Sequence, residues 1–221
     1  MVIAIDGPAG AGKSTVAQRV ASACGYIYID TGAMYRAATW VALLHKVDLC
    51  DEEAVVKLVQ AADIELKPPD EASRGRIRVY VDGSDATSII RSRIITRFVS
   101  QVSAIAGVRH IMVEKQKAMA CHGGVVMDGR DIGTVVLPFA DLKIFLTASP
   151  TVRAKRRLKE LKELGQAADF ETLLKDIQAR DNYDSTRIVS PLKQAEDAVL
   201  IDTDDLTIEQ VVERILNLCA S

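Results

Sequence analysis

Five short apolar runs along the chain each end at a polar residue. The runs cover residues 2–5, 26–29, 124–127, 142–146 and 198–201, and the polar residues that follow them are Asp6, Asp30, Asp128, Thr147 and Asp202. Short continuous runs rich in β-branched residues are typical of buried parallel strands. Helical periodicity occupies residues 13–24, 33–45, 105–120, 150–164, 170–181 and 207–219. The alternation predicts an α/β fold with a parallel sheet flanked by helices, and a ligand site at the carboxyl ends of the strands.

The segment from about residue 62 to residue 92 interrupts this alternation. Ile77, Val79 and Val81 alternate with polar residues, and Pro-Pro at residues 68–69 and Asp-Gly at residues 82–83 are turn signals. Strict alternation indicates strands with one face in contact with solvent. We therefore expect a small antiparallel meander inserted between strands of the main sheet.

Residues 7–15 read GPAGAGKST and fit the phosphate-loop pattern G-x-x-x-x-G-K-[ST]. An apolar strand precedes the motif and a helix follows it, which is the context that the motif requires. The loop predicts ATP binding by nine residues: Gly7, Pro8, Ala9, Gly10, Ala11, Gly12, Lys13, Ser14 and Thr15. In such loops the backbone approaches the phosphates, the lysine neutralises the β and γ phosphates, and the hydroxyl after it ligates Mg²⁺.

Asp128 follows the third apolar run and is the natural carboxylate partner of Ser14 at a Mg²⁺ site. A cap of the helix or turn that follows is the alternative for this residue. ATP as phosphoryl donor and Mg²⁺ are the expected cofactors.

Composition narrows the class of protein. The 221 residues contain 28 Lys and Arg against 30 Asp and Glu, and this net charge of -2 argues against a polynucleotide partner. No apolar run approaches 18 residues, so we expect no membrane span. Four cysteines without a CxxC pair, together with a first segment unlike a signal peptide, predict a reduced, cytoplasmic protein.

A phosphate loop indicates a nucleotide but no particular reaction. The Asn-Lys-x-Asp motif of guanine-specific GTPases is absent from the sequence, and the chain length favours a small-molecule kinase. Two alternatives stay open on the residues alone. One is a phosphate-loop kinase of another acceptor, such as UMP, AMP or shikimate. The other is a non-catalytic nucleotide-binding or assembly protein.

Four blocks of sequence resemble the bacterial cytidylate kinases, within the nucleoside monophosphate kinase superfamily. They are DTGAMYR at residues 30–36, DGRDIGTVV at residues 128–136, the polar residues between 180 and 187, and a block from SPL at residues 190–192 to IDT at residues 201–203. IRS at residues 90–92, VSQV at residues 99–102 and VR at residues 108–109 follow in the family's spacing. The blocks occur in order along nearly the whole chain, which makes the resemblance far more specific than the phosphate loop. It implies a five-stranded parallel sheet of order 2-3-1-4-5 and the Mg²⁺-dependent transfer of a phosphoryl group from ATP to CMP or dCMP.

The resemblance also implies a division of the chain. The kinase core would comprise residues 1–61, 121–150 and 191–221, the NMP-binding insert residues 62–120, and a mobile lid region residues 151–190. The partners would be the nucleotides ATP, CMP and dCMP, with no nucleic acid and no membrane, and the enzyme would act as a monomer.

The resemblance assigns roles to single residues. Catalysis would fall to Lys13, Arg130, Arg180 and Arg187. Binding of the acceptor nucleotide would fall to Thr31, Arg36, Ser100, Arg109, Arg130, Asp131, Asp184 and Arg187. Asp131 and Arg109 suit the base, because cytosine offers an amino donor at N4 and acceptors at N3 and O2. By the residues alone, Asp131 is equally a structural partner of Arg130 or a strand-end cap, and Arg109 a solvent-facing helical arginine.

Three arginines lie in the predicted lid: Arg153, Arg156 and Arg157. A solvated helix face paired with Glu160 and Glu163 and a contact with the nucleotide are equally compatible with their spacing. Arg157 is included among the candidate ATP-binding residues.

Overall fold

The computed structural model describes residues 1–71, 73, 75–163 and 165–220. The predicted end of one helix at residue 164 lies outside the described residues. The chain divides into two compact units. The first comprises Met1–Tyr28 and His122–Ser221, and the second comprises Ile29–Cys121. No helix within the described residues is both long enough and apolar enough to cross a membrane.

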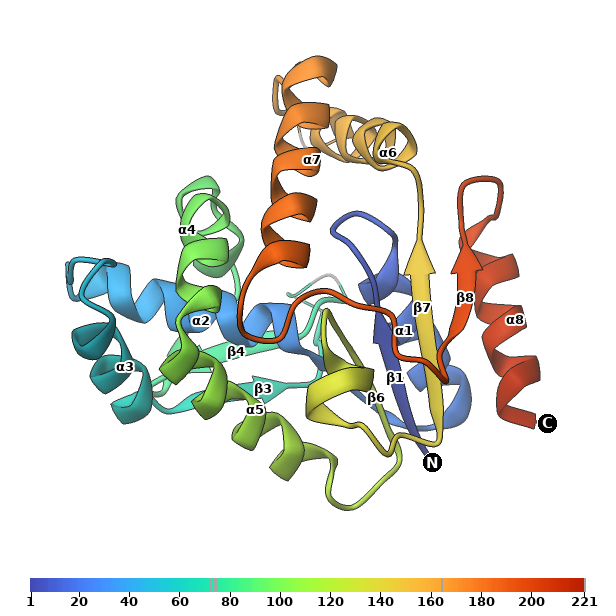
Figure 1. Cartoon of the computed structure of the whole chain (residues 1–221), viewed down its shortest axis with the longest axis horizontal. Helices are drawn as coiled ribbons and strands as arrows, with labels where there is room; N and C mark the ends of the chain where they lie inside the picture. Colours follow the sequence, from blue (N-terminus) through green and yellow to red (C-terminus); the bar gives the residue numbers. More distant parts are fainter. Residues whose placement is uncertain (72, 74, 164, 221) are drawn as a thin grey trace. The chain divides into compact units, whose positions relative to one another are not determined.

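A five-stranded parallel sheet forms the centre of the first unit (Figure 1). Its strands are β1 (Val2–Asp6), β2 (Ile27–Asp30), β6 (Val125–Gly129), β7 (Leu142–Thr147) and β8 (Val199–Asp202). The last two residues of β2 already belong to the second unit. The order β2-β6-β1-β7-β8 is 2-3-1-4-5 when the five strands are numbered along the chain, which confirms the predicted order. Asp6 lies opposite both Gly129 of β6 and Phe145 of β7, so β1 ends at the centre of the sheet's carboxyl edge.

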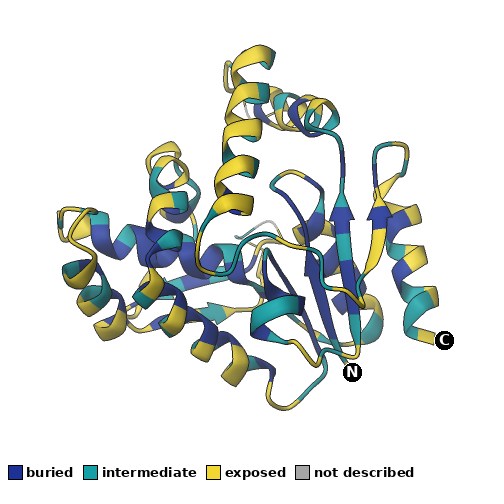
Figure 2. Ribbon diagram, viewed as in Figure 1, coloured by how far each residue is buried: buried dark blue, intermediate teal, exposed yellow. Residues whose placement is uncertain are grey.

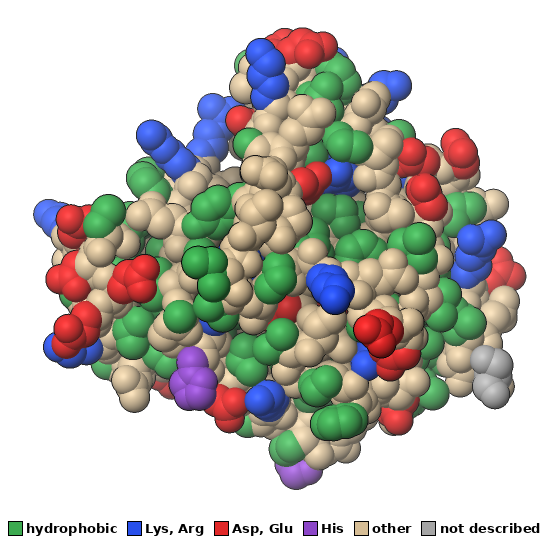
Figure 3. All heavy atoms as spheres, in the orientation of Figure 1, with side chains coloured by type: hydrophobic (Ala, Val, Ile, Leu, Met, Phe, Trp, Pro, Cys, Tyr) green, Lys and Arg blue, Asp and Glu red, His purple; other side chains and the backbone are tan. Residues whose placement is uncertain are grey.

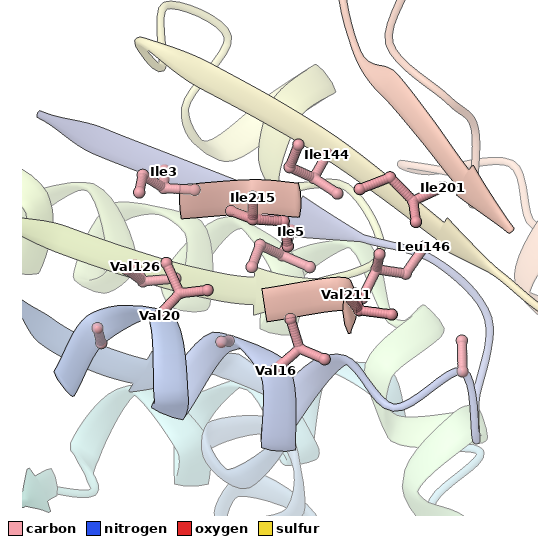
Figure 4. Packing of buried hydrophobic residues seen from close by; sticks show 13 residues of the cluster. Ile3, Ile5, Val16, Val20, Val126, Ile144, Leu146, Ile201, Val211 and Ile215 are labelled. Atoms are coloured by element: carbon pink, nitrogen blue, oxygen red, sulfur yellow. The ribbon is translucent and has the colours of Figure 1, made fainter. Parts of the chain in front are cut away.

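In the described part of the chain, four helices accompany this sheet. They are α1 (Lys13–Cys24), α6 (Pro150–Glu163), α7 (Phe170–Thr186) and α8 (Ile208–Ala220), and a π-helical turn spans Ile132–Val136. Figure 4 shows the apolar cluster in which Ile3 and Ile5 of β1 meet Val16 of α1 and Val211 and Ile215 of α8. Burying a side chain of this size contributes about 1.5–3 kcal/mol. The cluster fixes α1, and therefore the loop before it, against the end of β1.

Helix α7 differs from the other helices in its exposure. It is coloured as exposed along much of its length in Figure 2, and Asp184 is the buried residue within it. Its large apolar residues are at most partly buried and α7 packs against α6, so polar contacts add to a modest apolar interface in holding this helix.

Within its described residues, the second unit combines four helices with a three-stranded antiparallel sheet. The helices are α2 (Thr31–Leu44), α3 (Glu52–Ala61), α4 (Arg93–Ala104) and α5 (Ala106–Ala120), with a 3₁₀ turn at Ile89–Arg91, and the sheet consists of β3 (Ile64–Lys67), β4 (Arg78–Val81) and β5 (Ser84–Asp85). The meander is therefore confirmed. Asp82 and Gly83 join β4 to β5 with φ values of 49° and 75°, the left-handed pair that a tight hairpin requires.

Two helices of the second unit were not predicted from the sequence. Helix α4 buries Ile95, Val99 and Val102, which follow the i, i+4, i+7 pattern of a helix. Its Ile-Ile-Thr segment is typical of a strand by propensity, and this obscured the period. Helix α3 buries only Val55 and Val59, and its start is stabilised by Asp51, which accepts a hydrogen bond from the amide of Ala54 at 3.0 Å.

Gly7, the first residue after β1, has almost no space around it. Its φ is +145°, and a Cβ atom at this position would lie 2.0 Å from the carbonyl oxygen of Leu146 in β7. The phosphate loop therefore leaves the sheet in contact with the backbone of the neighbouring strand, which only glycine permits.

We expect Gly7→Ala to lower the free energy of unfolding by more than about 4 kcal/mol, because the backbone of β7 cannot move aside without breaking the sheet. Gly25→Ala is the matched control. Gly25 has φ +67° with nothing within 4 Å of its missing Cβ, so we expect a loss of about 1–2 kcal/mol from backbone strain alone. Urea unfolding measures both values. Equal losses would contradict a steric role for Gly7.

Candidate active site

The phosphate-loop motif spans residues 7–15, of which residues 7–12 connect β1 to α1 and residues 13–15 form the first turn of α1. Gly10 and Gly12 have φ values of 78° and 88°, which side chains on L-residues rarely adopt. The amide of Val16 donates to the carbonyl of Gly12 at 3.1 Å and begins the helix there. Because the first amides of a helix carry a partial positive charge, this turn favours an anion.

Lys13 lies within this turn and is only 5% exposed. Its Nζ donates a hydrogen bond to the carbonyl oxygen of Pro8 at 2.8 Å. Burial, and after it the nearby charge of Arg130, lower the pKa of Lys13 to about 7, although the charges of Asp128 and Asp6 act in the opposite direction. A lysine of this pKa takes up a proton when phosphate groups come near it.

Asp128, in β6, holds two hydroxyl groups. Ser14 Oγ donates to its Oδ2 at 2.9 Å and Tyr28 Oη donates to its Oδ1 at 2.8 Å. The carboxylate and the Ser14 hydroxyl are oxygen ligands of the kind that Mg²⁺ prefers, and Mg²⁺ usually takes its other ligands from water and substrate phosphates. Within the described residues, no group of three or more His, Cys, Asp and Glu side chains is placed to hold a metal ion. The donor set fits a Mg²⁺ ion that is bound together with phosphates.

Asp6 connects the end of β1 to the segment after β6. Its Oδ1 accepts a hydrogen bond from the amide of Ile132 at 2.8 Å, and its Oδ2 accepts one from the amide of Gly133 at 2.7 Å. Burial raises the pKa of Asp6 to about 6, although both amides act to lower it. The buried carboxylate therefore fixes the backbone directly after Asp131.

A group of arginines surrounds Asp184 on α7. Arg130 Nε donates to Asp184 Oδ2 at 2.9 Å. Burial alone would raise the pKa of Asp184, but the charges of Arg130, Arg180 and Arg187 outweigh it and lower the pKa below its usual range. The charge of Arg180 also lowers the pKa of Lys13, so Arg180 lies close to both groups. Three of the four predicted catalytic cations thus share one electrostatic environment with Asp184.

Arg187 follows the end of α7. Its Nε donates to the carbonyl oxygen of Ser190 at 2.6 Å, and its Nη2 lies 3.8 Å from Asp131 Oδ1. Asp131 thus forms an ion pair with Arg187, and Arg130 forms one with Asp184.

The remaining predicted acceptor residues lie in the second unit. Thr31 and Arg36 are on α2, Ser100 is on α4 and Arg109 is on α5, and α2 packs against both other helices. Arg109 is only 2% exposed, so the default expectation of a solvent-facing arginine is wrong. Its Nη1 donates to the carbonyl oxygen of Ser103 at 3.1 Å, and its guanidinium lies 5.2 Å from the centre of the Tyr35 ring.

The arginines of α6 have different environments. Arg157 is 43% exposed and pairs with Glu160 at 2.6 Å, as on a solvated helix face. Arg156 donates to the Thr203 hydroxyl at 3.0 Å. Arg153 is buried and pairs with Asp181 of α7.

A pocket of about 530 Å³ adjoins the phosphate loop. Its lining includes Pro8, Arg153, Asp181, Asp202 and Asp204, so it lies at the carboxyl ends of β1, β7 and β8. Its size is typical of small-molecule sites.

The comparisons with known proteins identify the family. The family model described as "Cytidylate kinase" matches residues 3–221. The chain belongs to the cytidylate kinase family. It is 56% identical over 216 residues to the cytidylate kinase of a Geobacillus species, covering 98% of this chain and 95% of that protein. It is 53% identical to the cytidylate kinase of Desulforamulus reducens, covering 97% and 94%.

Solved structures of lower identity support the same fold as the cytidylate kinase assignment. An uncharacterised protein from Eubacterium ventriosum has a TM-score of 0.53 at 12% identity, covering 100% of this chain and 99% of that one. A gluconokinase from Sinorhizobium meliloti has a TM-score of 0.50 at 16% identity, covering 98% and 89%. These similarities concern the α/β kinase fold alone.

Four residues that contact the site in the structure were not among the residues predicted for it. They are Asp6, Tyr28, Arg153 and Asp181. Asp6 had a detectable signal, since it is the polar last residue of a strand whose carboxyl end was predicted to form the site. Tyr28 lies inside β2 and had no such signal. Arg153 and Asp181 are 28 positions apart, and nothing in the sequence alone pairs them.

We expect ATP binding to this cytidylate kinase to take up protons at pH 8, because Lys13 with a pKa of about 7 is then largely neutral and phosphates raise its pKa. The apparent affinity for ATP should accordingly fall as the pH rises above 7. Titration calorimetry in buffers of different ionisation enthalpy measures the uptake. Lys13→Arg, which stays protonated, should abolish it. The absence of uptake in the wild type would contradict the lowered pKa.

Proposed function

We propose that this chain catalyses the ATP-dependent phosphorylation of CMP and dCMP to CDP and dCDP. Its membership of the cytidylate kinase family supports the reaction class and the substrates. The observation that carries the proposal is the arrangement in the first unit, where the phosphate loop with Lys13 adjoins the paired oxygens of Ser14 and Asp128 and the arginine group at Asp184.

The phosphate loop suits the donor nucleotide. Its glycine turns and the start of α1 favour the phosphates, and Lys13 neutralises their charge. Ser14 and Asp128 would hold Mg²⁺, which supplies charge neutralisation at the β and γ phosphates when it is bound. The adjoining pocket has room for the base and ribose of ATP, and we propose that the rest of the donor lies there.

The acceptor phosphate needs no general base. The second pKa of a phosphate monoester is about 6, so the attacking group is already mostly dianionic at neutral pH. The protein must instead bring two anions together and keep them in line. Arg130 and Arg187 would hold the acceptor phosphate through bidentate contacts, and Arg180, close to Lys13, would neutralise the phosphoryl group in transfer.

Recognition of cytosine would rest on complementary polarity. A carboxylate suits the N4 amino group and a guanidinium suits N3 and O2, whereas uracil presents a carbonyl where cytosine has its amino group. Asp131 and Arg109 are the proposed base contacts, with Thr31 adding a hydroxyl. Ser100 and Asp184 are the proposed sugar contacts, and the roles of Arg36 and Arg157 stay predictions. ATP and CMP are cytoplasmic metabolites, and we propose that the enzyme acts in the cytoplasm.

An acceptor panel tests the function. ADP formation from ATP and Mg²⁺ is measured with CMP, dCMP, UMP and AMP at equal concentrations. We expect CMP and dCMP to be phosphorylated fastest. Faster turnover of UMP or AMP would overturn the cytosine assignment, and ATP binding without any acceptor-dependent ADP formation would overturn the kinase assignment.

We expect Asp131→Ala to raise the KM for CMP at least about 100-fold and the KM for ATP less than about threefold, because a lost charged hydrogen bond to the base costs the acceptor alone. Steady-state kinetics with each nucleotide varied in turn measures the split. Asp176→Ala, which removes an exposed carboxylate of α7, is the control and should change neither value. Equal losses for the two nucleotides would exclude Asp131 as a base contact.

A further inference from the structure

Arg153 lies in the first turn of α6 but makes contacts in three other places. Its Nε donates to the carbonyl oxygen of Ala148 at 2.8 Å, directly after β7. Its Nη1 donates to the carbonyl oxygen of Ala9 in the phosphate loop at 3.1 Å. The side chain is only 3% exposed, so these are buried contacts and not those of a solvated helix face.

The third contact is a bidentate ion pair with Asp181 on α7. Arg153 Nη1 donates to Asp181 Oδ1 at 2.9 Å, and Nη2 donates to Oδ2 at 2.6 Å. Two parallel hydrogen bonds between a guanidinium and a carboxylate fix the orientation of both groups as well as their distance. A buried guanidinium without its carboxylate would carry a large desolvation cost, so the pair is strongly constrained to form.

The phosphate loop also rests on the aliphatic part of Arg153. A Cβ atom on Gly10 would lie 3.3 Å from the Cβ of Arg153. The backbone of the loop therefore packs on this side chain at Gly10 and accepts its hydrogen bond at Ala9.

Asp181 lies on α7 between residues to which we assign the reaction. Arg180 precedes it directly, and Asp184 follows within one helical turn. Since Asp184 is the fully buried residue of α7 and its large apolar residues are at most partly buried, polar contacts such as this ion pair contribute to its position. A displacement of Asp181 moves Arg180 and Asp184 with it.

We propose that Arg153 and Asp181 are a positioning pair that fixes α7, and with it Arg180, relative to the phosphate loop. This inference rests on the proposed function, because Arg180 is placed there at the transferred phosphoryl group. Arg153 and Asp181 also line the pocket proposed for the rest of the donor, but the role we assign to the pair is to act through Arg180. Lysine cannot replace Arg153, because a single ammonium nitrogen cannot reach Ala148, Ala9 and both oxygens of Asp181 together.

The test compares Asp181→Asn with Arg153→Lys, the two conservative changes. Each should lower kcat by about 10- to 100-fold, because small displacements of a charge-neutralising group cost that much. The KM for ATP and the KM for CMP should each change less than about threefold. Asp176→Asn, on the exposed side of α7, is the matched control and should leave kcat unchanged.

A double-mutant cycle with Arg180→Ala separates positioning from a general loss of structure. If Asp181 acts through Arg180, adding Asp181→Asn to Arg180→Ala should lower kcat by less than about twofold further. Urea unfolding of all variants shows whether each one is folded under assay conditions.

Three results would overturn the proposal. They are an unchanged kcat in both single variants, a full additional loss in the Arg180→Ala background, and a loss that appears mainly in the KM for ATP, which would make the pair a nucleotide contact. Failure of the proposed function is seen separately, as absence of CMP-dependent ADP formation by the wild type. If another acceptor proves to be the substrate, the same cycle is read with that acceptor.

Discussion

Withdrawal of like charges from solvent at one edge of a sheet, nearly complete for Lys13 and partial for its arginine neighbours, is the constraint on which the rest of the site depends. Four cationic side chains influence one another's surroundings here, and each would carry a desolvation cost if it lacked a counter-charge. They are Lys13, Arg130, Arg180 and Arg187. The carboxylates that offset these charges come from strand ends and from α7: Asp6, Asp128, Asp131 and Asp184. The parallel sheet brings the strand ends to one edge, and α7 contributes the remaining carboxylate.

This constraint explains the lowered pKa of Lys13 as well as the ion pairs. Burial and two arginines oppose the positive charge of Lys13, so this lysine is not permanently protonated. Protonation of the Lys13 amine is therefore coupled to the binding of phosphate groups. An electrostatic site of this kind is organised before the substrate binds, which lowers the reorganisation needed during the reaction.

The sheet and the phosphate loop could be predicted from the sequence because each has a local signal, whereas the strand order was predicted from the resemblance to the cytidylate kinases. Apolar runs that end in Asp6 or Asp128 mark the strands, and the glycines with Lys13 mark the loop. Contacts between distant segments have no such signal. The burial of Arg109 and the pairing of Arg153 with Asp181 depend on which helices pack together, and a helical arginine in the sequence has the same appearance whether it is buried or exposed. Helix α4 was missed because its β-branched residues favour a strand by propensity, whereas packing of its i, i+4, i+7 face decides the structure.

Basic and acidic side chains are interspersed on the face drawn in Figure 3, so the nearly neutral total charge of the chain conceals the cationic group at the site.

The contact of Gly7 with Leu146 has a consequence for how the protein acquires its nucleotide site during synthesis. The phosphate loop is nine contiguous residues near the start of the chain, yet its first residue is shaped by a strand about 140 positions later. Contacts of such sequence separation form late, after the loop between them has been closed. The anion-binding turn is thus a product of the completed sheet and not a local structure. A nascent chain that still lacks β7 has the whole motif in its sequence without the backbone that gives the motif its shape.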